Sequence, residues 1–105
     1  MDGIKSWIKK IKSDIGDIDP EDFEVFGHPV DETDIEGNTA LHYACSNNHR
    51  KVAKVLINAR ADINMAGQWE CTPLHLSCVY AHINTADLLL SRKENIDIFK
   101  VHFIF

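Results

Sequence analysis

Apolar and small residues recur at helical spacing in two stretches of the middle of the chain. The shared positions are i, i+3 and i+4, which lie on one face of a helix. They are occupied by Leu41, Ala44 and Cys45 in the first stretch and by Leu74, Ser77 and Cys78 in the second. A second apolar stripe follows each of them, formed by Val52, Val55 and Leu56 and then by Thr85, Leu88 and Leu89. The pattern therefore predicts four amphipathic helices, in two pairs.

The two pairs are related by a constant offset of 33 residues. Thr39-Ala40-Leu41-His42 recurs as Thr72-Pro73-Leu74-His75, and the agreement continues through His49, which aligns with His82. A fixed period of this length indicates stacked supersecondary units. Thr39 and Thr72 each precede an inner stripe, where a threonine can cap a helix.

These segments resemble the ankyrin repeat, whose hallmark is Thr-Pro-Leu-His-x-Ala at this period. The resemblance implies an all-α fold in which each repeat is a turn followed by two antiparallel helices. We assign residues 34–66 to the first repeat and 67–99 to the second. Residues 1–33 are expected to form an amphipathic helix and an acidic linker or cap, and 100–105 an apolar tail that begins a truncated third unit.

The sequence departs from the family pattern where glycine is usual. Asn48, Glu70 and Ala81 stand at such positions, and Gly37 is retained. Asparagine tolerates left-handed backbone, whereas the other two would carry strain of about 1 kcal/mol. Residues 92–95 also replace the usual turn, so the second repeat is expected to be less regular.

Both ends of the chain raise the question of what covers the stack, since two repeats alone rarely suffice. An N-terminal stripe at helical spacing comprises Ile4, Trp7, Ile8, Ile11 and Ile15. It is interpreted as a cap on the first repeat, with a membrane- or partner-docking helix and the end of an upstream domain as alternatives. The apolar tail either continues into missing sequence, folds back, or pairs with another copy.

Charge and cysteine content narrow the classes of function. Residues 14–36 hold ten acids and no lysine or arginine, and the whole chain has a net charge of −5, which argues against nucleic-acid binding. The three cysteines fit a reducing compartment, so a cytoplasmic or nuclear location is expected. No segment has transmembrane length or a signal-peptide pattern.

The duplicated pattern His42, Cys45, His49 and His75, Cys78, His82 has the composition of a metal site. The resemblance offers a structural explanation instead. It implies that the first histidine bonds at the start of the inner helix, that the cysteine is a small core residue, and that the second histidine begins the outer helix. Cys71 is expected to be an inert surface thiol. No cofactor, metal site or catalytic constellation is predicted, so the chain is not expected to be an enzyme.

By the same resemblance, hairpin tips and the exposed side of the inner helices would form a concave surface that binds another protein. The predicted contact residues are Ile35, Glu36, Asn38, Ser46, Asn47, Gln68, Trp69, Val79 and Tyr80. The same surface includes Ala66 and Cys71, and it can extend to Phe99. Trp69 and Tyr80 are the favoured anchors because aromatic residues concentrate binding energy, although Trp69 packed on its neighbouring hairpin or on the tail is the alternative.

The leading hypothesis is a non-catalytic protein-interaction module. A second is an accessory segment of a larger protein, such as an acyl-CoA-binding protein or a signalling enzyme. A third is recruitment to a membrane surface through the basic N-terminal helix, and self-association through the tail is a further possibility.

Overall fold

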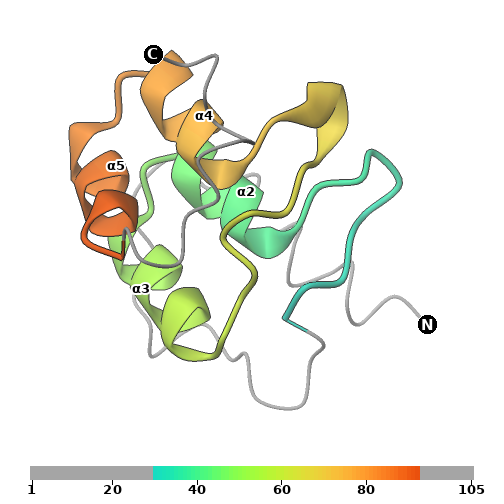
Figure 1. The fold of residues 1–105 in the computed structure, drawn as a ribbon, viewed down its shortest axis with the longest axis horizontal. Helices are drawn as coiled ribbons and strands as arrows, with labels where there is room; N and C mark the ends of the chain where they lie inside the picture. Colours follow the sequence, from blue (N-terminus) through green and yellow to red (C-terminus); the bar gives the residue numbers. More distant parts are fainter. Residues whose placement is uncertain (1–29, 93–105) are drawn as a thin grey trace.

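A computed structural model describes residues 30–92. This part of the chain contains two helical pairs and no β-strand. The first pair is α2 (Ala40–Ser46) and α3 (Arg50–Asn58), and the second is α4 (Pro73–Val79) and α5 (Ile83–Leu90). A short 3₁₀ turn, η2 (Gln68–Glu70), precedes α4. The predicted all-α fold is confirmed, and Figure 1 shows the two pairs side by side.

The inner helices α2 and α4 start at equivalent residues for the same local reason. Thr39 is the N-cap of α2, and its Oγ1 accepts the backbone N–H of His42 at 3.4 Å. The His42 ring completes a capping box, because its Nδ1 accepts the backbone N–H of Thr39 at 3.0 Å. Thr72 and His75 repeat this arrangement at α4, with corresponding distances of 3.4 Å and 3.0 Å. The duplicated motif therefore encodes a duplicated helix start.

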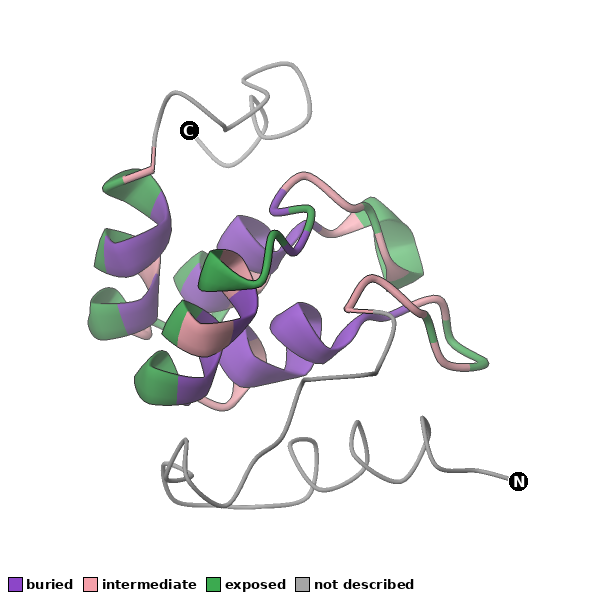
Figure 2. Cartoon of the chain, turned by 90° about the horizontal axis from the view of Figure 1, so that it is seen from below, coloured by how far each residue is buried: buried purple, intermediate pink, exposed green. Residues whose placement is uncertain are grey.

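The helices form two layers, with α2 against α4 on the inner side and α3 against α5 on the outer side. Buried residues line the facing surfaces of the helices, while the outward surfaces are exposed (Figure 2). Leu41, Leu56 and Leu89 are among the largest fully buried side chains. The predicted stripes therefore do form the core, except that Val55 is only half-buried and Cys78 is exposed.

The expectation that Cys78 is a core residue is wrong. Cys45 is completely buried, whereas Cys78, 33 residues later, is exposed. The reason is positional, because Cys45 lies against the second repeat, near Ser77, while Cys78 belongs to the second repeat, which no further helical pair follows within residues 30–92. Burial raises the pKa of the Cys45 thiol to about 12. The sequence period identified equivalent positions but not equivalent surroundings.

Histidines and an asparagine bridge the two repeats. His42 Nε2 lies 2.9 Å from the carbonyl oxygen of Cys71, and His82 Nε2 lies 2.9 Å from that of Ser46. The Asn38 Oδ1 accepts the backbone N–H of Gln68 at 3.0 Å. These hydrogen bonds fix the register of one repeat on the other. The relative position of the two repeats therefore does not depend on apolar packing alone.

The left-handed backbone expected at the glycine-like positions is present. Asn48 has φ of 60°, Glu70 of 60° and Ala81 of 58°, and Gly37 has φ of 87°. Trp69 is also left-handed, with φ of 61°, which the sequence did not indicate. The first repeat has a further left-handed residue of its own, Arg60, with φ of 71°, and α5 is one residue shorter than α3. The lower regularity expected of the second repeat therefore stays a prediction.

The assigned N-terminal helix and acidic linker, the apolar tail and Phe99 lie outside the described residues. None of the helices within 30–92 combines the length and the apolar character needed to cross a bilayer.

Candidate binding surface

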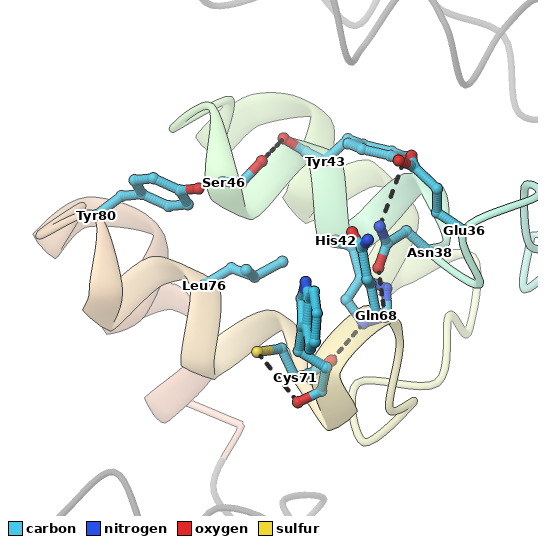
Figure 3. A pocket seen from close by; sticks show the side chains of 10 residues that line it. Glu36, Asn38, His42, Tyr43, Ser46, Gln68, Cys71, Leu76 and Tyr80 are labelled. Carbon is cyan, nitrogen blue, oxygen red and sulfur yellow. Dashed lines mark hydrogen bonds between the residues drawn. The ribbon is translucent and has the colours of Figure 1, made fainter.

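A hollow of about 300 Å³ lies between the inner helices and the hairpins that precede them. Both repeats contribute to it, as Figure 3 shows. We call it the groove, and its lining residues are Glu36, Asn38, His42, Tyr43, Ser46, Gln68, Trp69, Cys71, Leu76 and Tyr80. The stacking of one repeat on the other therefore creates a concavity that neither repeat has alone.

Polar groups organise the end of the groove nearest the hairpins. The Tyr43 hydroxyl donates to the Asp34 carboxylate and lies 3.2 Å from Glu36 Oε1. Asn38 Nδ2 donates to the Tyr43 hydroxyl at 3.4 Å. Burial, followed by the hydrogen bond to the Asp34 carboxylate, raises the pKa of Tyr43 above its ordinary value. Tyr43 therefore stays protonated and holds the two carboxylates at this end.

Aromatic and apolar residues form the rest of the groove. Trp69, at the tip of the second hairpin, is 83% exposed, and Tyr80, at the end of α4, is 56% exposed. Tyr80 stacks on His82 with ring centroids 6.1 Å apart, and His82 is bonded to the first repeat. The Leu76 side chain extends from α4 into the hollow, with Tyr80 on one side of it and Glu36 on the other (Figure 3). The groove thus has an apolar end and an acidic end.

The structure brings most of the predicted contact residues together. Six of the nine line the groove, namely Glu36, Asn38, Ser46, Gln68, Trp69 and Tyr80. Ile35 and Val79 are strongly exposed but lie beyond its lining, and Asn47 is half-buried as the C-cap of α2. Cys71 lines the groove, whereas the exposed Ala66 does not.

Two predicted residues have structural roles beyond surface presentation. Asn38 is only 8% exposed, because its amide joins Tyr43 to the second hairpin. Ser46 is half-buried, and its carbonyl is the bond partner of His82. Both residues shape the groove, but little of the Asn38 side chain is accessible to a partner.

Sequence reasoning missed Tyr43, Leu76 and His42 as groove residues. Tyr43 and Leu76 are equivalent under the 33-residue period, and each precedes a predicted contact residue, Ser46 or Val79, by three positions. The i, i+3 spacing on the inner helices was therefore a usable signal. His42 gave no such signal. Its hydrogen bonds to the backbone already explain why a histidine stands there, so its sequence position did not indicate a place in the groove.

Hydrogen bonds and helix starts explain the duplicated histidines, as the resemblance implied. The His42 ring uses Nδ1 at its own helix start and Nε2 at the next hairpin. His49 and His82 are the N-caps of α3 and α5. Within residues 30–92, no three His, Cys, Asp or Glu side chains are grouped closely enough to hold a metal ion.

A sequence model of ankyrin repeats in three copies matches residues 17–100. The chain belongs to the ankyrin repeat family. Ankyrin repeats generally mediate protein–protein interactions and are generally non-catalytic. The match begins well before residue 34, where the first repeat was predicted to start.

Curated relatives share the ankyrin segment. The chain is 38% identical over 63 residues to the tyrosine-protein kinase HTK16 of Hydra vulgaris, covering 60% of this chain and 8% of that protein. It is 33% identical over 74 residues to inversin of Gallus gallus, covering 67% and 7% respectively. A putative ankyrin repeat protein of Acanthamoeba polyphaga mimivirus, L112, is 29% identical over 85 residues, covering 81% and 16%. The chain thus spans less than a fifth of each of these relatives.

Proposed function

We propose that this chain is a non-catalytic module that binds another protein in the groove between its two repeats. The observation that carries the proposal is the exposure of Trp69 and Tyr80 at a concavity built by both repeats. Large aromatic side chains left this exposed beside a hollow are typical of interface anchors. The mechanism is rigid presentation, since hydrogen bonds between the repeats fix the positions of the hairpins and inner helices.

The exposure of Trp69 supports binding over the alternative of internal packing. A tryptophan packed on its neighbouring hairpin would lose most of its accessible surface, yet 83% of it remains accessible. Its backbone is also left-handed, with φ of 61°. A non-glycine residue in this conformation costs about 1 kcal/mol or more, a strain that is often found at functional positions.

The test is affinity capture from the native cell with the double variant Trp69→Ala and Tyr80→Ala. Captured proteins are expected to disappear, while the melting temperature stays nearly unchanged because both side chains are exposed. Ile83→Ala with Leu90→Ala is the matched control, since these residues are 77% and 44% exposed on α5, away from the groove. A large loss of stability in the groove variant would refute the proposal. Equal capture by the wild type, the groove variant and the control variant would refute it as well.

We also propose that the module works as the accessory segment of a larger protein. Its support is the small share, 7–8%, that the chain covers of the kinase and inversin relatives. Sequencing the full-length transcript tests it, and an open reading frame confined to these residues would contradict it.

The free state of all three cysteines supports a reducing location, cytoplasmic or nuclear. Membrane recruitment and self-association through the tail stay predictions.

A further inference from the structure

The charges of the described residues are segregated around the groove. Among its lining residues the only charged carboxylate is Glu36, which is joined through Tyr43 to Asp34. The basic residues of the described range lie on α3 or in the turns after the outer helices, and they are Arg50, Lys51, Lys54, Arg60 and Arg92. The groove therefore presents negative charge at one end, and the positive charge lies on other surfaces.

Aromatic faces lie along the same hollow as this carboxylate. Trp69 and Tyr80 both line it and both are exposed. The face of an indole or phenol ring attracts a cation, with tryptophan the strongest of the aromatic residues. An arginine side chain suits this combination, because its planar guanidinium stacks on rings and also donates several hydrogen bonds to carboxylates.

We propose that the groove binds an extended peptide segment of a partner protein that carries an arginine, with an apolar side chain nearby. The arginine is bound by Glu36 and by the ring of Trp69, and the apolar side chain lies against Leu76 and Tyr80. This inference rests on the proposed function and specifies its partner. Charge complementarity selects the occupant, because a peptide with an acidic residue at that point would be repelled by the carboxylates.

The length of the inner helices gives a scale for the spacing of the two peptide side chains. α2 and α4 have seven residues each, so they are about 10 Å long at a rise of ~1.5 Å per residue. An extended peptide advances roughly 3.3 Å per residue. The arginine and the apolar residue are therefore expected to stand about three positions apart.

The experiment is phage display of random twelve-residue peptides on the whole protein, followed by fluorescence anisotropy with the selected peptides. Selected peptides are expected to be enriched in arginine with an apolar residue about three positions away. Glu36→Gln should weaken their binding roughly two- to fivefold at low salt, and Trp69→Ala by at least roughly fivefold. Asp87→Asn and Ile83→Ala are the matched controls, which alter an acid and an apolar residue on α5 and should leave binding unchanged.

Different results would overturn different statements. Peptides that bind in a Trp69-dependent manner but lack basic residues, or that bind equally well to Glu36→Gln, overturn the arginine inference and leave the groove as the binding site. Peptides that bind equally well to the Trp69→Ala and Tyr80→Ala double variant overturn the proposed function as well. Failure to select any peptide also overturns the inference, which requires direct binding of a short segment.

Discussion

Replacing Ala81 with glycine is expected to stabilise the protein. Ala81 has φ of 58° between α4 and α5 and is exposed, so truncating its methyl group sacrifices little packing. An L-residue in the left-handed region costs roughly 1–2 kcal/mol, which glycine avoids. Glycine also gains freedom in the unfolded chain, which offsets roughly 0.5–1 kcal/mol of this. The expected net gain is therefore about 0.5–1 kcal/mol.

Ala66→Gly is the matched control, because Ala66 is also exposed but its φ is not positive. This variant relieves no backbone strain, so its free energy of unfolding should fall by roughly 0.5–1 kcal/mol. Urea denaturation and thermal unfolding by circular dichroism measure both variants. For a domain of this size, each kcal/mol corresponds to about 4–8 °C in melting temperature, so the two variants should differ by several degrees in opposite directions. If Ala81→Gly is no more stable than wild type, or if Ala66→Gly gains as much, the strain at Ala81 does not exist.

Two further predictions concern buried titratable groups. Burial lowers the pKa of His42 and of His75 below the ordinary value of 6.5, so the unfolded chain binds protons more readily than the folded one. The free energy of unfolding should therefore fall as the pH drops below about 6.5, and urea titrations at pH 7.5, 6.5 and 5.5 measure it. A flat profile would contradict the neutral rings that the capping boxes require. Thiol labelling followed by mass spectrometry should modify Cys71 and Cys78 in the native protein and Cys45 only after unfolding; rapid native labelling of Cys45 would refute the packing of one repeat on the other.

Much of the fold was predictable because residues within each repeat determine where its helices begin and where its backbone turns. The threonine and histidine of each capping box are both present in the sequence, so the starts of α2 and α4 followed from it. The left-handed positions at Glu70 and Ala81 also followed, since glycine is usual there. The position of Trp69 in the groove was also predictable. The 33-residue period places Trp69 in the hairpin before the second inner helix, and such hairpins border the binding surface in the family.

The errors share a physical cause, which is that a repeat motif does not specify its neighbours. Cys78 was expected in the core by analogy with Cys45, but burial there depends on what stacks next. Asn38 was expected at the surface, yet the second hairpin covers it and engages its amide. Helical spacing could have placed Tyr43 in the groove, but its bonds to Asp34 and Glu36 could not be predicted, because the loop conformation alone brings these carboxylates to its hydroxyl.

The bridges between the repeats also bear on how such a protein can change over evolutionary time. His42 reaches forward to the backbone of the following hairpin, and His82 reaches back to the backbone of the preceding inner helix. Both acceptors are main-chain carbonyls, which every residue possesses. A duplicated 33-residue stretch inserted into the array would meet the same acceptors whatever its surface side chains. New binding specificities can therefore arise when a repeat is duplicated and its exposed residues change, while the hydrogen bonds between repeats stay the same.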